Sequence, residues 1–179
     1  LRPEAAQRSK VAASMRGWQV APDGASWRRV VPSPRPLRIL EVGVIDLLVR
    51  HDIVVICTGG GGIPVVERAD GSLLGVEAVI DKDFASALLA RQLGADMLML
   101  LTDVDAVYRA FGTPEARPIH RSSPEELEQL PLPPGSMGPK VAAAIGFVRE
   151  TSKPAAIGRL EDALAILHGG SGTRIEPSA

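Results

Sequence analysis

Residues 53–90 read IVVICTGGGGIPVVERADGSLLGVEAVIDKDFASALLA, and this stretch decides the fold of the chain. The apolar run at residues 53–57 predicts a strand buried on both faces, and four consecutive glycines follow it at residues 59–62. Glycines at the carboxyl end of a strand expose backbone N–H groups, which commonly bind phosphate. The triplet Asp81-Lys82-Asp83 then places both signs of charge at the start of a helix. The stretch therefore predicts an anion-binding site.

Helix and strand patterns alternate on both sides of this stretch. Apolar spacing predicts helices over residues 39–50, 84–93 and 160–167, and a helix after Lys140 whose buried stripe is Val141, Ala144, Ile145 and Val148. Strands are predicted over residues 97–101, 155–157 and 172–175. This alternation is typical of an α/β sheet, in which ligands collect at the carboxyl ends of the strands. We therefore expect the segment that begins at Asp103 to face the same crevice as the glycines.

Turn and loop signals account for the remaining segments. Two hairpins are expected, one joining residues 18–20 to 27–31 through a turn at residues 21–24, and one joining residues 63–67 to 73–76. Ser123 begins a capping box, residues 110–120 read as loop, and residues 3–16 read as a polar helix. The proline-rich segment at 32–36 is a linker by default, although Ser33 within it is a candidate contact for a substrate anion. We expect a small lobe over residues 1–31 and a main domain over residues 32–179.

Composition excludes several classes of function. A net charge of −1 and an aromatic content of 3% provide neither the basic surface nor the stacking surface that nucleic-acid binding requires. No apolar run approaches the length of a membrane helix. The single cysteine, Cys57, is expected to be a small buried residue of a strand in a cytoplasmic protein. No spacing of residues indicates a metal site, so no metal ligand is assigned.

Two lysines stand out because arginine supplies most of the basic residues. Lys82 and Lys140 each precede or begin a predicted helix beside a glycine-rich turn, and Asp83 adjoins the first of them. Phosphoryl transfer needs such positioned cations, because catalysis consists mainly of neutralising the oxygens of the transferred group. In the alternative interpretation Asp83 is a helix N-cap and Lys82 is a solvated side chain. The familiar nucleotide fingerprints are absent, so the residues alone indicate an α/β domain with an anion site, with a kinase as one possibility.

Several motifs together resemble the carbamate kinases of the amino acid kinase family. They are VVPSPRP at 30–36, TGGGGIPV at 58–65, VIDKDFAS at 79–86, LTDVDAVY at 101–108, GSMGPK at 135–140 and GTRI at 172–175. The resemblance implies a three-layer αβα sandwich of the amino acid kinase type. It also implies reversible phosphoryl transfer between carbamoyl phosphate and ADP, which gives ATP and carbamate, with Mg²⁺ as the cofactor.

The resemblance also assigns roles to individual residues. Lys82 and Lys140 correspond to lysines that contact the phosphoryl group, and Asp83 to the aspartate that organises them. The glycines at the substrate and phosphoryl site are Gly59, Gly60, Gly61 and Gly62. The residues expected to frame the nucleotide are Asp103, Val104, Asp105, Tyr108, Ser136, Met137 and Gly138. A homodimer acting in arginine metabolism is further implied, while composition alone argues against nucleic-acid and membrane partners.

The chain departs from the family pattern at its amino-terminal side. Family members begin with a strand and a glycine loop that contact the transferred group, and neither occurs in this sequence. We therefore expect a carboxyl-terminal portion of the fold, with its N-terminal part missing, that is weakly active or inactive alone and marginally stable or self-associating. The alternatives are another amino acid kinase, with acetylglutamate, glutamate or UMP as acceptor, or a non-catalytic nucleotide-binding module.

Overall fold

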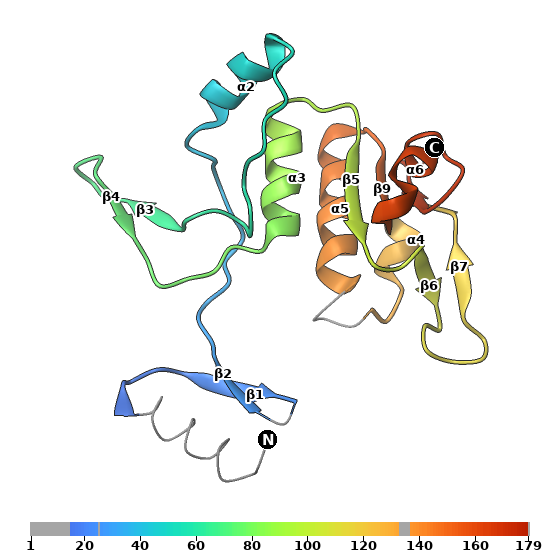
Figure 1. Ribbon diagram of the computed structural model, residues 1–179, viewed down its shortest axis with the longest axis horizontal. Coiled ribbons are helices and arrows are strands. Elements are labelled where there is room, and N and C mark those ends of the chain that lie inside the picture. Colours follow the sequence, from blue (N-terminus) through green and yellow to red (C-terminus); the bar gives the residue numbers. More distant parts are fainter. Residues whose placement is uncertain (1–14, 25, 133–136, 179) are drawn as a thin grey trace. The chain divides into compact units, whose positions relative to one another are not determined.

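The computed structural model describes residues 15–24, 26–132 and 137–178, and the helix expected over residues 3–16 falls almost wholly outside them (Figure 1). The chain divides into two compact units: unit 1 comprises Leu1–Pro34 and Ile63–Val79, and unit 2 comprises Arg35–Gly62 and Ile80–Ala179. The first boundary between these compact units follows Pro34. The expected division after Val31 into a small lobe and a main domain stays a prediction. The assignment of residues 63–79 to unit 1 was not expected.

Unit 1 contains two antiparallel hairpins. The first pairs β1 (Val20–Asp23) with β2 (Ser26–Arg29), and the second pairs β3 (Val65–Glu67) with β4 (Leu73–Gly75). The second hairpin confirms the sequence prediction. In the first, we expected Pro22 and Asp23 in the turn, and this was wrong: both lie in β1, with Pro22 opposite Trp27. A two-stranded ribbon has only edge strands, where a proline without an N–H is tolerated.

Unit 2 is built on a four-stranded sheet in the order β5–β9–β10–β8. Strand β5 (Leu98–Thr102) runs parallel to β9 (Ala155–Arg159), β9 is antiparallel to β10 (Thr173–Ile175), and β10 is parallel to the short β8 (Arg121–Ser122). The helices of unit 2 are α2 (Val42–Arg50), α3 (Lys82–Gln92), α4 (Pro124–Glu128), α5 (Met137–Thr151) and α6 (Ala163–Leu167), with the 3₁₀ turn η1 (Leu160–Asp162) before α6.

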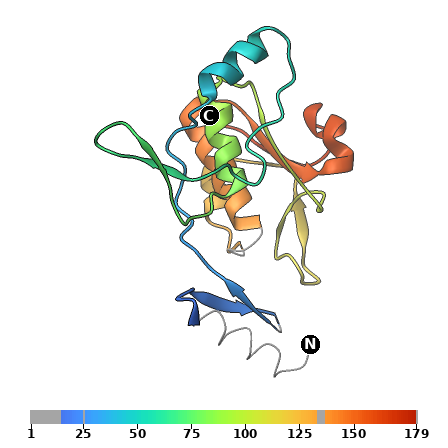
Figure 2. The same cartoon turned by 60° about the vertical axis from the view of Figure 1, so that its left-hand side comes forward.

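The helices of unit 2 form layers on the sheet. Figure 2 shows α3 and α5 together on one face, and α6 on the other, where it packs against β9. The predicted stripe of α5 is buried, with Val141, Ala144 and Val148 each at most 2% exposed. These side chains join β5, β9 and β10 in one hydrophobic core, against which Phe84 of α3 also packs. The three-layer αβα arrangement expected from the resemblance is confirmed. None of the helices in the described ranges is long and apolar enough to cross a bilayer.

The capping box predicted at the start of α4 is also confirmed. The Ser123 hydroxyl accepts from the Glu126 N–H, and the Glu126 carboxylate accepts from the Ser123 N–H. The expected loop at residues 110–120 is partly wrong, because β6 (Val107–Arg109) pairs with β7 (Arg117–Ile119) as a further hairpin. Pro118 hid this strand from the sequence pattern, since proline disfavours strand interiors; it lies opposite Tyr108 in the two-stranded ribbon.

The prediction of a buried strand at residues 53–57 is wrong. The segment forms no strand, Val54 is 91% exposed and Ile56 is 99% exposed. Cys57, expected to be buried in that strand, is only partly buried. The physical reason is that no strand among the described residues pairs with the segment, so its backbone and its apolar side chains have no layer to join.

Candidate functional site

The first turn of α3 presents the charged triplet to a pocket. The Asp81 carboxylate caps the helix by accepting from the Asp83 N–H at 2.7 Å. Asp81, rather than Asp83, is therefore the N-cap, which removes the alternative interpretation of Asp83. The Lys82 side chain lines the pocket and is exposed, whereas Asp83 is 6% exposed.

Asp83 of α3 and Lys140 of α5 meet at the edge of this pocket. Lys140 Nζ donates to both carboxylate oxygens of Asp83, at 2.9 and 3.0 Å, and the two side chains are only 12% and 8% exposed. Among the ion pairs of the described residues, this is the most buried. Desolvating two charges opposes the attraction between them, so a pair of this kind is weak evidence of stability and a reasonable marker of function.

The four-glycine loop lies against the residue that precedes this triplet. A Cβ built on Gly61 would fall 1.8 Å from the carbonyl oxygen of Ile80, and Gly61 has a φ of +134°. The N–H of Gly59 donates to Cys57 and that of Gly61 to Thr58, so the loop is folded onto itself. Within the described residues, the N–H groups of Gly60 and Gly62 remain available for a ligand.

The pocket beside the Asp83–Lys140 pair has a volume of about 570 Å³. That volume falls within the range typical of small-molecule sites. Charged side chains at the starts of α3 and α5 form one part of its lining. Apolar side chains from β5, from the segments that follow it and from α5 form the other part. The lining residues are Asp81, Lys82, Asp83, Leu101, Thr102, Asp103, Val104, Ala106, Tyr108, Phe111, Leu132, Met137, Pro139 and Lys140.

A pair of aromatic rings borders the apolar part of the pocket. The Tyr108 hydroxyl is within hydrogen-bond distance of both Asp105 carboxylate oxygens, at 3.0 and 3.1 Å, and donates to that carboxylate. This hydrogen bond raises the pKa of Tyr108, because ionisation of the phenol would forfeit it and set two negative charges side by side. The Phe111 ring stands edge-on to the Tyr108 ring, with centroids 5.8 Å apart.

The structure brings together most of the residues that the sequence singled out for the nucleotide. Asp103, Val104, Tyr108 and Met137 line the pocket. Asp105 does not line it, but accepts a hydrogen bond from Tyr108, which does. Gly138 lies in α5 but does not line the pocket, and Ser136 lies outside the described residues. Ser33 is exposed and belongs to unit 1, so its contact with a substrate stays a prediction.

Sequence reasoning missed several lining residues. Phe111 and Leu132 lie in segments without helical or strand periodicity, and nothing in the sequence pattern distinguishes them from ordinary loop residues. Asp81 was identified only as part of a charged triplet; its position before an apolar helix was the available cap signal.

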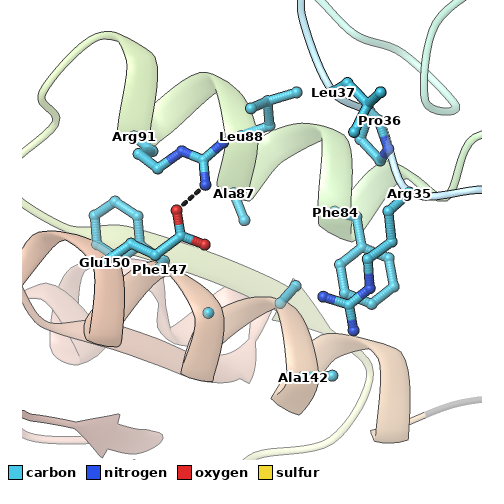
Figure 3. Close-up of a pocket in the computed structure, with 12 residues that line it drawn as sticks. Arg35, Pro36, Leu37, Phe84, Ala87, Leu88, Arg91, Ala142, Phe147 and Glu150 are labelled. Carbon is cyan, nitrogen blue, oxygen red and sulfur yellow. Dashed lines mark hydrogen bonds and ion pairs between the residues drawn. The ribbon is translucent and has the colours of Figure 1, made fainter.

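A second groove, of about 240 Å³, lies between α3 and α5 (Figure 3). Arg35 extends into it with its guanidinium 4.4 Å from the centre of the Phe84 ring, and Arg91 forms an ion pair with Glu150 at its other side. Arg35 is therefore engaged with an aromatic ring and lines a different pocket from the one that holds Asp83 and Lys140.

The carboxylates of the main pocket bear on metal binding. No group of three or more histidine, cysteine, aspartate or glutamate side chains within the described ranges has the arrangement to hold a metal ion. Asp81 and Asp103 nevertheless line the pocket. Mg²⁺ in kinases is commonly held by one or two carboxylates together with the phosphates of the nucleotide. These two carboxylates are therefore of the kind that can hold Mg²⁺ together with a phosphate ligand.

Comparison with known proteins gives consistent matches. A model of the amino acid kinase family matches residues 7–159. A carbamate kinase of Escherichia coli O6:H1 is 52% identical over 159 residues, covering 89% of this chain and 52% of that protein. A carbamate kinase of Pyrococcus horikoshii is 45% identical over 174 residues, covering 94% and 55%. The solved carbamate kinase of Giardia lamblia bound to AMP-PNP has a TM-score of 0.85 and 42% identity, covering 96% and 56%. The chain spans about half the length of the relatives that it matches.

Proposed function

The chain belongs to the amino acid kinase family, and we propose that it carries the nucleotide and phosphoryl-transfer part of a carbamate kinase. The observation that carries the proposal is the buried Asp83–Lys140 pair at the edge of a pocket large enough for a nucleotide. The identities of 45–52% with carbamate kinases support carbamoyl phosphate as the substrate over acetylglutamate, glutamate or UMP.

The reaction moves a phosphoryl group from the carbamate oxygen of carbamoyl phosphate to a terminal phosphate oxygen of ADP. The oxygen–phosphorus bond to carbamate breaks, and a bond to ADP forms, which gives ATP and carbamate. In this proposal Lys82 and Lys140 neutralise oxygens of the transferred group, and Asp83 fixes the Lys140 ammonium with two hydrogen bonds. Asp83 is thus an orienting group, with no proton to remove.

The glycine loop is proposed to receive the carbamoyl phosphate side of the reaction. Its free N–H groups, at Gly60 and Gly62, are donors of the kind that bind anionic oxygens. The contact of Gly61 with Ile80 holds the loop next to the start of α3. Mg²⁺, when bound with the nucleotide, would neutralise further phosphate charge, and Asp81 and Asp103, which line the pocket, are the carboxylates that would hold it. Cytoplasmic location, homodimer formation and a role in arginine metabolism are further parts of the proposal.

Titration calorimetry with ADP and Mg²⁺ tests nucleotide binding, and ATP formation from carbamoyl phosphate and ADP tests the reaction. Lys140→Met should weaken ADP binding roughly tenfold to a hundredfold, since hydrogen bonds to charged groups contribute about 1.5–3 kcal/mol. Lys82→Met should weaken it as well. Because Lys82 is exposed, this variant keeps the test valid if unpaired Asp83 destabilises the first one.

Lys153→Met is the matched control for both variants. Lys153 also forms an ion pair, with Asp96, but it lines neither pocket, so its replacement should leave ADP binding unchanged. The proposal is wrong if ADP fails to bind, or if the Lys82 and Lys140 variants bind ADP as the control does. ATP formation from ADP with acetylglutamyl phosphate, glutamyl phosphate or UDP as the phosphoryl donor, and none with carbamoyl phosphate, would change the assigned substrate.

A further inference from the structure

We propose that Thr173 is a positioning residue of the main pocket, because its buried hydroxyl holds the β6–β7 hairpin, which carries part of the pocket lining. The inference rests on the proposed function, since it assigns to Thr173 the task of keeping that lining ready for a nucleoside diphosphate. Thr173 belongs to the GTRI segment at residues 172–175, which has no role in the proposed reaction. Its side chain is 0% exposed and does not line the pocket, so Thr173 acts through the residues that it holds.

The Thr173 hydroxyl bridges the two strands of the hairpin at its open end. Val107, the first residue of β6, lies opposite Ile119, the last residue of β7 (Figure 1). The Val107 N–H donates to the Thr173 hydroxyl at 2.8 Å, and this hydroxyl donates to the Ile119 carbonyl at 2.5 Å. One side chain of β10 therefore joins an N–H of one strand to a carbonyl of the facing strand, and it ties both strands to the sheet.

The surroundings of this bridge make its hydrogen bonds costly to lose. Val107 is 0% exposed and Ile119 is 8% exposed, and both belong to the hydrophobic core of unit 2. A backbone N–H or carbonyl that is buried without a partner loses the hydrogen bond that water gives it in the unfolded chain. Without the Thr173 hydroxyl, the hairpin has to shift until its backbone groups find other partners.

The segment that leads into β6 rests on the sheet at the same place. A Cβ built on Gly158 of β9 would fall 3.1 Å from the Asp105 carbonyl oxygen and 3.1 Å from the Gly172 Cα. The backbone before β6 therefore lies in close contact with β9 and with the start of the GTRI segment. Such contacts set how near the segment lies to the sheet, whereas the directional hydrogen bonds of Thr173 set its position along the sheet.

Val107 connects this bridge to the pocket. Its neighbours on both sides, Ala106 and Tyr108, line the pocket, whereas the Val107 side chain packs in the core. The Val107 N–H and the Ala106 carbonyl belong to one planar peptide unit, so a shift of the N–H moves both residues. Lys82 and Lys140 come from the starts of α3 and α5 and not from the hairpin. Loss of the bridge should therefore displace one part of the lining and leave the two cations in place.

Titration calorimetry with ADP and with inorganic pyrophosphate, each with Mg²⁺, tests this inference. Thr173→Val keeps the size of the side chain and removes the hydroxyl. It should weaken ADP binding about tenfold, as expected when about one tenth of the molecules keep the hairpin in the binding position. Pyrophosphate binding should stay within about twofold, because it depends on the lysines at the helix starts. Thr173→Ser retains the hydroxyl and should restore ADP affinity.

Val148→Ala is the matched control for a loss of stability alone. Val148 is 1% exposed in the same hydrophobic core and lines neither pocket, so this variant should melt at a lower temperature and keep both affinities. Thr173→Cys has a similar volume and only a weak donor, so it should give smaller losses of the same kind. It takes the place of Thr173→Val if thermal melting shows that the valine variant does not fold.

The outcomes separate this inference from the proposed function. If Thr173→Val binds ADP as the unsubstituted chain does, or loses ADP and pyrophosphate affinity equally, the positioning role is overturned while nucleotide binding stands. Failure of Thr173→Ser to restore ADP affinity also overturns it, and so does an equal loss of ADP affinity in Val148→Ala. If the unsubstituted chain does not bind ADP, the proposed function fails first and this inference with it.

Discussion

The two helices α2 and α5 of unit 2 are both apolar in sequence, yet they have opposite surroundings. On α5, Phe147 and Val148 are at most 2% exposed. On α2, Val44 and Leu47 are 62% and 55% exposed, and Ile56 in the segment after it is 99% exposed. The difference lies in what each segment packs against, because α5 meets α3 and three strands whereas no described strand pairs with residues 53–57. Apolar patterning therefore reports the tendency to be buried, and a packing partner decides the outcome.

Replacing one buried and one exposed residue of this comparison by alanine should give the largest difference in the free energy of unfolding. Phe147→Ala should lower the free energy of unfolding by about 3–5 kcal/mol, since it removes a fully buried ring and leaves a cavity. Ile56→Ala, at 99% exposure, should change it by less than about 0.5 kcal/mol. Urea unfolding followed by circular dichroism measures both. A loss of several kcal/mol in Ile56→Ala would show that this segment is covered in solution, and light scattering would then identify self-association.

The glycine loop is an intermediate case between the buried side chains of α5 and the exposed side chains of α2 and residues 53–57. Gly61→Ala should destabilise the chain by at least about 1–3 kcal/mol, because its backbone conformation is one that side chains avoid and its Cβ would overlap the Ile80 carbonyl. Gly60→Ala is the matched control, since no atom lies within 4 Å of its Cβ position, and it should be nearly neutral. Urea unfolding measures the free energy of unfolding of both variants. Equal stability would mean that the loop does not rest against Ile80.

The smallest expected effect concerns the charges that join α4 to α5. The Ser178 hydroxyl, then the backbone N–H of Glu125 and then Arg149 lower the pKa of Glu125 to about 2, and Arg149 also lowers the pKa of Glu128. A carboxyl whose pKa is lower in the folded state stabilises the fold above its unfolded pKa of 4.5, and this contribution is lost as the pH falls from there towards 2. We expect a modest loss of stability over that range, measured by urea unfolding at several pH values.

Arg149→Gln should reduce that acid sensitivity by removing the shared partner of the two glutamates. Arg50→Gln is the control on α2, where Arg50 forms an exposed pair with Asp46 inside a single helix. Such pairs contribute little at any pH. An unchanged pH profile in Arg149→Gln would show that these contacts do not persist in solution.

Sequence reasoning found the parts of the fold whose signals are local. The apolar stripe of α5, the Ser123 capping box and the β3–β4 hairpin are all specified by residues within one or two turns of chain, and all three are confirmed. The buried strand at residues 53–57 was wrong because burial depends on a partner that the local pattern cannot report. The β6–β7 hairpin was missed because Pro118 disguises a strand.

The site was predictable to a similar extent. Asp83 and Lys140 are 57 residues apart in sequence, and the structure shows them in contact. Their charges and the family resemblance together predicted both as site residues. Phe111 was not found, because one aromatic residue in a connection has no periodicity to mark it. Its position depends on the turn at Ala110, whose φ of +49° is a backbone conformation that the sequence does not reveal.

The hydrogen bond between Tyr108 and Asp105 gives the protein a built-in optical probe. Tyr108 is the single tyrosine of the sequence and lies in the pocket lining of unit 2, whereas both tryptophans, Trp18 and Trp27, belong to unit 1. Phenol absorbance therefore reports on the pocket, and indole fluorescence reports on the other unit, without any introduced label. Because the pKa of Tyr108 is raised, its ionisation in alkaline titration also measures whether Asp105 still holds the ring.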